Sequence, residues 1–210
     1  MADNYLEKKM EEYLQRPATK PRKRSSLVDL LAKNRSHRGF DNKFTVREDQ
    51  LRSIVEVNRL IPSARNQQVL RFRMVLADES HLVLPHIRLG GALPELHLPF
   101  EGQEPRAFVI ICSTEAESKY VDMDLGIAAQ SMLLRAVEMG LNGICIGAFD
   151  KVALREAFAL PYEPLLVLAI GRGAERIQIV DIRADEEHTY YRCDDVHFVP
   201  KVCLEDLIIK

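Results

Sequence analysis

Many common signatures of function are missing from this chain. Its 210 residues carry a net charge of only −2, which argues against general nucleic-acid binding. The four cysteines form no C-x-x-C pair and no metal-ligand spacing, so we assign no metal. No apolar run approaches membrane-spanning length, and the charged start, MADNYLEKKMEEYLQR, does not resemble a secretory signal. These absences predict a cytoplasmic protein that binds neither nucleic acid nor membrane.

What is present indicates one domain with extensions. A chain of this length with 47% hydrophobic residues can bury one sizeable core. We expect the domain to span residues 25–210, with a last part, from about 176, that reaches onto a partner. Residues 1–24 are predicted to be a polar helix followed by a linker, whose KPRKR cluster is either a solvated segment or an anion site. Helices alternate irregularly with strands, which predicts an α+β sandwich with a mixed, mainly antiparallel sheet.

The segment from 122 to 149, DMDLGIAAQSMLLRAVEMGLNGICIGAF, organises the chain. Its first part predicts a long helix opened by the acidic Asp122 and Asp124, because acidic side chains suit a helix N-terminus. Apolar residues point nearly all round this helix, which is typical of a helix buried in a core or against another subunit. A short apolar strand with Cys145 in its core should follow and break at Gly147. Such a turn could hold a ligand or could simply end the strand.

Two polar segments are candidate binding sites. In NRSHRGF (34–40), the side chains of Arg35, Ser36 and Arg38 could converge on a phosphate in a turn, although such residues are also common in surface loops. In PSARNQQ (62–68), Ser63 and several amides precede a predicted strand. These amides could bind the edge of a heterocycle or satisfy the backbone of their own loop.

Helix-start signals and the chain end complete the pattern. Ser25 or Ser26 can cap a helix from Leu27 to about Lys33, and residues 45–48, TVRE, fit a capping box. HTYYR and VHFVP flank residues 193–195 in the manner of a hairpin. The last segment, CLEDLIIK, is apolar and needs a surface to lie on, which favours a homodimer.

Four segments together resemble the FMN-dependent nitroreductase family. NRSHRGF is similar to its R-R-S-x-R-x-F pattern, and PSARNQQVLRF to its P-S-x-x-N-x-Q-P-W-x-F loop. The 122–149 segment resembles its D-x-G-x-A-x-Q-N-L-L-L-A-A-x-x-x-G-L-G helix and the following turn, and LLVLAIGRG resembles its I-G-x-P strand end. The resemblance covers about residues 27–173 in order. Val69 and Leu70 depart from the Pro-Trp of the pattern, and Gly173 from its final Pro.

The resemblance implies an α/β/α sandwich that forms a homodimer with FMN at the subunit interface. It implies that Arg35, Ser36 and Arg38 hold the phosphate and ribityl chain, and that Ser63, Asn66 and Gln68 contact the flavin. Ile146, Gly147 and Ala148 would lie along one face of the ring, with the Gly147 backbone N–H donating to flavin N5.

A flavin would explain the missing catalytic signatures. The chain has no Ser-His-Asp order, no carboxylate pair and no G-x-G-x-x-G after a strand, and a flavin carries hydride chemistry itself. We therefore expect an oxidoreductase in which NAD(P)H and an electron-poor acceptor, such as a nitroaromatic or quinone, react in turn. The alternatives are another flavin chemistry on the same fold (enone, flavin or dehalogenating reduction), a non-catalytic flavin-binding protein, or an interaction module using the basic N-terminal segment.

Overall fold

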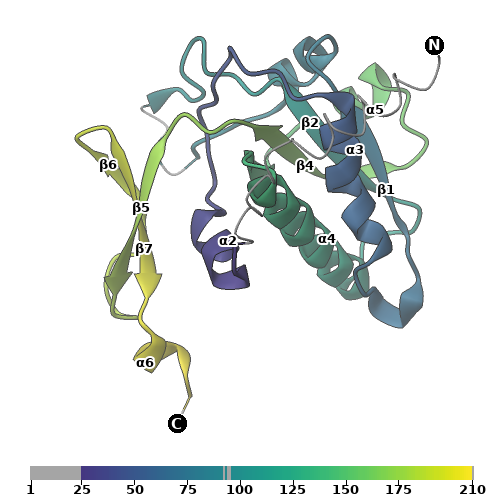
Figure 1. The fold of residues 1–210 in the computed structure, drawn as a ribbon. Helices are drawn as coiled ribbons and strands as arrows, with labels where there is room; N and C mark the ends of the chain where they lie inside the picture. The colour runs from purple at the N-terminus through teal and green to yellow at the C-terminus, as the bar shows by residue number, and fades with distance from the viewer. Residues whose placement is uncertain (1–24, 92, 94–95, 210) are drawn as a thin grey trace, which may run out of the picture.

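The centre of the protein is a four-stranded antiparallel sheet with the strand order β1-β2-β4-β3 (Figure 1). The computed structural model describes residues 25–91, 93 and 96–209, so the helix and the basic cluster expected within residues 1–24 lie outside the described residues. All seven residues of β2 are buried, as the apolar run predicts for a central strand. The strands are β1 (Leu70–Val75), β2 (Ala107–Ser113), β3 (Asn142–Ile146) and β4 (Glu163–Gly171).

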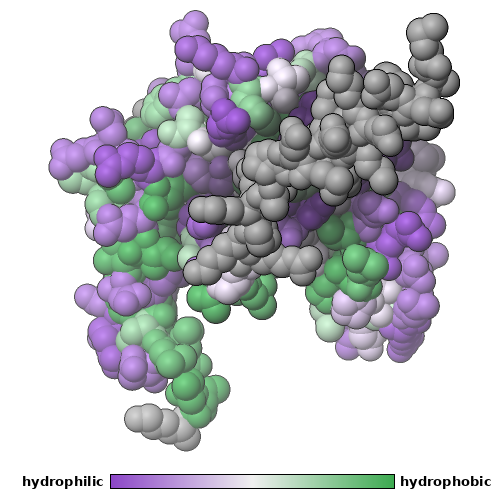
Figure 2. Space-filling view, in the orientation of Figure 1, coloured by the Kyte–Doolittle hydropathy of each residue, from purple (hydrophilic) through white to green (hydrophobic). Residues whose placement is uncertain are grey.

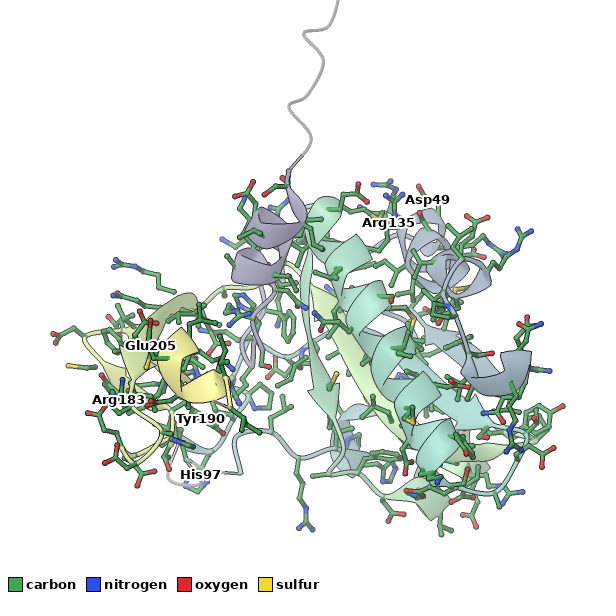
Figure 3. The ribbon with its side chains drawn as sticks, turned by 90° about the horizontal axis from the view of Figure 1, so that it is seen from below. Asp49, His97, Arg135, Arg183, Tyr190 and Glu205 are labelled. Atoms are coloured by element: carbon green, nitrogen blue, oxygen red, sulfur yellow. The ribbon has the colours of Figure 1, made fainter. Side chains whose placement is uncertain are left out.

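Two helices pack one apolar cluster against the first face of this sheet. These are α3 (Glu48–Glu56), which continues into a 3₁₀ turn at Val57–Arg59, and the long α4 (Lys119–Glu138). Arg135 of α4 reaches α3 and donates to Ser53 Oγ at 2.9 Å (Figure 3). The shorter α2 (Leu27–Lys33) lies against α4. Side chains from the helices and from alternate positions of β2 and β4 form this cluster, including Leu51, Ile54, Val109, Ile111, Met132, Leu133, Leu168 and Ile170.

A second apolar cluster lies on the other face of the sheet. It takes the remaining positions of the same strands, because successive side chains of a strand point to opposite faces. Leu154 of α5 (Lys151–Ala157) and Val83, between the 3₁₀ turns Ser80–Leu82 and Leu84–His86, close it. Helical elements on both sides of a sheet give the α/β/α sandwich expected from the sequence. The strand residues of this cluster include Val75, Phe108, Ile110, Cys112, Ile144, Ile146, Val167 and Ala169.

Helices α2 and α4 each begin after a serine whose side chain accepts a backbone N–H of the first turn, and two of the expected helix starts were wrong. Ser26 caps α2 as expected. Its Oγ accepts the Asp29 N–H at 3.1 Å, and the Asp29 carboxylate accepts the Ser26 N–H at 3.1 Å. The capping box expected at 45–48 is wrong: α3 begins at Glu48, and Gln50 Oε1 accepts the Arg47 N–H at 3.0 Å. Helix α4 begins at Lys119 after the N-cap Ser118, so Asp124 lies within the helix, where it is 4% exposed.

The C-terminal part forms a separate three-stranded sheet that projects from the main body (Figure 1). Its order is β5-β7-β6, with β5 (Arg176–Ile182) parallel to β7 (Val196–Val202) and β6 (Tyr191–Cys193) antiparallel to it. The expected hairpin is therefore present, and Asp194 and Asp195 turn it with positive φ. Among the named strands of the described residues, the parallel pair is β5 with β7 in this second sheet, whereas the four strands of the main sheet pair antiparallel. The mixed character expected of one sheet is therefore divided between two.

A short helix, α6 (Leu204–Leu207), ends the described chain. It is joined to the end of β5 by the ion pair of Arg183 with Asp206, at 2.6 Å between Nη2 and Oδ1. Figure 3 shows Arg183 and Glu205 together in this part of the molecule. The apolar side chains that follow are open to solvent, with Ile208 59% and Ile209 98% exposed.

Candidate functional site: an anion pocket and a glycine turn

The segment that carries Arg35, Ser36 and Arg38 is fixed by the ends of two core strands. Ser36 pairs with Gly143 at the start of β3, and the His37 N–H donates to the Gly143 carbonyl at 3.2 Å. A few residues later, Phe40 pairs with Gly173, just after β4. The segment therefore follows the edge of the main sheet as an extended stretch rather than as a free surface loop.

The three predicted phosphate ligands line one cavity of about 320 Å³. The structure thus brings Arg35, Ser36 and Arg38 together, as the sequence predicted. The other wall comes from the C-terminal sheet and was missed by sequence analysis. Its residues in β7 are His197, Val199 and Lys201, and their i, i+2, i+4 spacing was the available signal, because it places them on one face of a strand. Asn34 and Tyr190 complete the lining.

The cavity is rich in positive charge with unused hydrogen-bonding capacity. Three cations, Arg35, Arg38 and Lys201, line it. Within the described part of the chain, the Nε atoms of Arg35 and Arg38 are buried and have no hydrogen-bond partner. Arg38 is only 9% exposed, and its guanidinium lies 4.3 Å from the centre of the Tyr190 ring (Figure 3 labels Tyr190). Buried donors without partners are costly, so this cavity fits an anionic ligand.

His197 is a neutral neighbour of this charge cluster. Burial, together with the positive charges of Arg38 and Arg192, lowers the pKa of His197 to about 4. Its Nε2 lies 3.4 Å from Arg38 Nη1. Because a guanidinium can only donate, Nε2 must act as the acceptor in this contact, which places the imidazole proton on Nδ1. The ring therefore adds no charge near pH 7 and helps to orient Arg38.

The polar loop at 62–68 is held by a buried carboxylate of α4. Asp124 accepts the Ala64 N–H at 2.7 Å and the Gln67 side-chain N–H at 2.9 Å. Asp124 was expected to be a charge at the helix start, and instead it anchors this loop. The anchor matters because Arg65, Asn66 and Gln68 all have positive φ, which is unusual for residues other than glycine.

The loop residues therefore divide into two groups. Gln67 is engaged by Asp124 and satisfies the fold. Asn66 and Gln68 are exposed, and the Gln68 amide donates to Asn66 Oδ1 at 3.0 Å. Ser63 and Gln68 line a cavity of about 520 Å³ between α3 and β1, which is separate from the anion pocket.

The glycine turn follows β3 directly. A Cβ atom built on Gly147 would meet no other atom within 4 Å, and Gly147 and Ala148 are both exposed. Backbone hydrogen bonds fix the residues that follow Gly147. The Arg88 N–H donates to the Ala148 carbonyl at 2.9 Å, and the Asp150 N–H donates to the His86 carbonyl at 2.8 Å. Neither contact occupies the open side of Gly147, so a flat ligand can approach this turn closely.

The flanking strand residues point in opposite directions. Ile146, expected beside the ligand, is 2% exposed and packs in the second apolar cluster, which leaves only its backbone for a ligand. Cys145, expected in the core, is exposed. That expectation was wrong because β3 is an edge strand whose alternate residues, Ile144 and Ile146, take the buried side.

A single chain does not gather all the predicted site residues into one cavity. The phosphate-type trio lines one depression, Ser63 and Gln68 of the 62–68 loop line a second, and Ala148, next to Gly147, lines a third. In residues 25–91, 93 and 96–209, no three or more His, Cys, Asp or Glu side chains cluster as metal ligands would. No helix in the same residues combines the length and apolarity needed to cross a membrane.

Comparison with known proteins finds related sequences and structures. Over a stretch of 57 residues, this chain is 37% identical to the nitroreductase-like protein MJ1384 of Methanocaldococcus jannaschii. The stretch covers 27% of this chain and 29% of that protein. Among solved structures, a nitroreductase family protein of Streptococcus pneumoniae matches with a TM-score of 0.61 at 16% identity, over 73% of this chain and 93% of that one.

Two further structures show the same fold. A nitroreductase-like protein of Exiguobacterium sibiricum, solved in complex with FMN, matches with a TM-score of 0.58 at 16% identity, over 72% of this chain and 90% of that one. A protein of Staphylococcus epidermidis that resembles NAD(P)H:FMN oxidoreductases matches with a TM-score of 0.58 at 18% identity, over 72% of this chain and 88% of that one. The sequence model of the nitroreductase family matches residues 31–172, which include the trio, the polar loop, α4 and the glycine turn. The chain belongs to the nitroreductase family.

Proposed function

We propose that this protein is an FMN-dependent oxidoreductase that takes a hydride from NAD(P)H and reduces a small electron-poor acceptor, such as a nitroaromatic or a quinone. The observation that carries the proposal is the anion pocket, where Arg35, Arg38 and Lys201 converge and two buried Nε donors lack partners among the described residues. A phosphate monoester suits such a pocket, because arginine presents fork-shaped donors to anionic oxygens.

A small number of residues would bind and orient the cofactor. FMN, when bound, supplies the hydride chemistry, so the protein needs only to bind, orient and tune it. Arg35, Ser36, Arg38 and Lys201 hold the phosphate. Asn66 and Gln68 would offer exposed amides to the ring or ribityl chain, and the Gly147 N–H would donate to a nitrogen of the flavin ring. The open space at Gly147 would let a flat ring approach the turn closely, as this last role requires.

We propose further that the working form is a homodimer with a flavin site at the subunit interface. Parts of the site that stay in separate depressions of one chain can meet when two chains associate. Two surfaces support association: the side of α4 where Met123 is 56% and Ile127 is 38% exposed, and the apolar tail that begins with α6. Figure 2 shows this tail as a hydrophobic patch at the end of the C-terminal extension. Such apolar surface is a liability on a lone subunit.

The direct test is the absorption spectrum of the purified protein, followed by turnover. We expect a yellow protein whose flavin is released as FMN on denaturation, and steady oxidation of NADH or NADPH when a nitroaromatic or quinone is added. A colourless protein that does not take up added FMN would refute the cofactor assignment. Bound FMN without nucleotide oxidation would refute the enzymatic assignment alone.

A pair of substitutions tests the phosphate pocket separately. Charged hydrogen bonds contribute roughly 1.5–3 kcal/mol each. Replacing Arg35 and Arg38 together by alanine should therefore weaken FMN binding at least about a hundredfold, measured by titration of the apoprotein. Riboflavin, which lacks the phosphate, is the matched control and should change far less. Equal losses for the two flavins would show that the arginines do not meet the phosphate.

A further inference from the structure

Glu175 is a buried carboxylate beside the anion pocket. It lies between β4 and β5, and its side chain is 6% exposed. One of its oxygens, Oε2, accepts the backbone N–H groups of Arg38 and Gly39, the latter at 3.0 Å. Two successive backbone N–H groups that converge on one point form an anion-binding nest. In this protein the nest is filled internally by the Glu175 carboxylate.

The second oxygen of Glu175 joins this nest to the C-terminal sheet. Oε1 accepts from the guanidinium of Arg192 in β6, whose side chain is 21% exposed. Arg192 stands directly opposite His197 of β7 in the strand register. One carboxylate thus contacts the segment that carries Arg35, Ser36 and Arg38 and, through β6, the strand that carries His197 and Lys201. These are the two walls of the anion pocket.

If only its charge mattered, Glu175 would weaken the binding of an anion in the pocket. A carboxylate close to a site for phosphate repels the ligand, and this repulsion is strong where water is excluded. The contacts of Glu175 suggest the opposite net effect, because they hold backbone and side-chain donors that would otherwise lose their partner. Removing one member of a buried charged pair leaves the other uncompensated and lets the local structure rearrange.

We propose that Glu175 is the positioning residue of the anion pocket. Its carboxylate sets the 35–39 segment and the C-terminal sheet in the register that lets Arg35, Arg38 and Lys201 act on one phosphate. This inference rests on the proposed FMN function, and it concerns affinity for the phosphate group rather than for the ring.

The test is the sign of the change in phosphate-dependent binding when the charge of Glu175 is removed. Glu175→Gln preserves the size of the side chain and removes the negative charge. Apoprotein is titrated with FMN and with riboflavin, and binding is followed by flavin fluorescence. Positioning predicts FMN binding at least tenfold weaker, with riboflavin binding within about twofold of wild type. Simple repulsion predicts tighter FMN binding, and that result would overturn the proposal, as would an unchanged FMN affinity or equal losses for both flavins.

Matched variants separate positioning from general damage. Asp181→Asn removes an exposed carboxylate of β5 and should leave both affinities unchanged; an FMN-specific loss there would overturn the proposal. Arg192→Gln breaks the same bridge from its other end and should repeat the FMN-specific loss, whereas Arg192→Lys keeps the charge and should recover most of it. If Glu175→Gln does not fold, the two Arg192 variants decide, and no FMN-specific loss in Arg192→Gln would overturn the proposal.

The wild-type titration distinguishes this proposal from the one on which it rests. Wild-type protein that binds FMN no more tightly than riboflavin would refute the phosphate pocket itself. Wild-type protein that prefers FMN, with the same preference kept by Glu175→Gln, would refute only the role of Glu175.

Discussion

Gly147 is a glycine that the folded chain itself does not require. Its φ lies outside the left-handed region, and an added Cβ would meet no atom within 4 Å. Alanine should therefore be accommodated without strain in the free protein. Any cost of Gly147→Ala must come from a ligand that approaches the turn closely, which makes this position a probe of the proposed ring site.

Substituting Gly147 by proline should slow flavin reduction specifically. Proline removes the backbone donor, and preorganised donors aimed at developing charge are worth about 2.7–4 kcal/mol. We expect reduction by NAD(P)H to fall at least tenfold more than FMN affinity, in stopped-flow measurements on fully loaded protein. Gly147→Ala keeps the N–H and should do much less to either quantity. Wild-type reduction rates in loaded Gly147→Pro would contradict the assignment.

His197 should make the free protein less stable in mild acid. Its pKa is lowered from 6.5 to about 4 in the fold, so the unfolded chain binds its proton first as the pH falls. The stabilisation from a neutral His197 is complete above about pH 6.5 and is lost as the pH falls toward 4, by at most about 3 kcal/mol at 1.36 kcal/mol per pKa unit. Urea denaturation of the apoprotein at pH 7 and pH 4.5 measures this loss.

The comparison with His197→Gln isolates this residue from other groups that titrate in the same range. One of these is His37, whose pKa is lowered by burial and by Arg38 despite an opposing effect of Glu175. The glutamine variant should lose less stability on acidification than the wild type. Equal losses of unfolding free energy in the two proteins would show that His197 does not cause the loss of stability between pH 7 and pH 4.5.

At the scale of elements, α4 contributes to the candidate site at two places. Its Asp124 anchors the 62–68 loop, and its Gln130 accepts a hydrogen bond from Asn34, next to the anion pocket, at 3.3 Å. The helix thus links two parts of the site that the sequence keeps far apart. The same helix exposes Met123 and Ile127, which form one of the surfaces that we propose for association with a partner subunit.

Loss of the Asp124 carboxylate should release the strained loop. Asp124→Ala leaves the Ala64 N–H and the Gln67 amide without their acceptor, which costs roughly 1–3 kcal/mol for a buried donor. We expect this loss in urea denaturation, together with weaker FMN binding. Asp122→Ala, an exposed position of the same helix, is the control and should cost less than about 1 kcal/mol. Equal costs for the two variants would show that the anchor contributes nothing specific.

The sequence predicted individual helices and strands better than it predicted the contacts between them. The runs around β2 and β4 indicated central strands because both faces are apolar, and the Arg35–Arg38 cluster indicated an anion site because its members are neighbours in the chain. Asp124 was misassigned because its partners lie about 60 residues away. Lys201 and His197 were missed because their contribution depends on how the second sheet is placed against the first. Cys145 was misassigned because an apolar run does not reveal that its strand lies at a sheet edge.

At the scale of the whole molecule, the apolar tail should determine assembly. The tail exposes Leu204, Leu207, Ile208 and Ile209. Deleting residues 203–210 should lower both dimer stability and flavin occupancy, because a site shared between subunits depends on their association. Sedimentation over a range of protein concentrations, with flavin content measured in parallel, tests this. A truncated protein that stays dimeric with full flavin would leave the exposed side of α4 as the sole basis of assembly.

The packing of His37 on Gly173 restricts how this sequence can change. A Cβ at position 173 would lie 2.2 Å from His37 Nδ1, and the Gly173 N–H donates to Asn142 Oδ1 at 3.1 Å. The proline of the family pattern would therefore collide with the imidazole and remove the donor at once. Substitutions at the two positions are coupled, because a larger residue at 173 requires the buried imidazole to move or to be replaced by a smaller side chain. Any mutational path from this chain toward the family pattern must therefore also change the packing of His37.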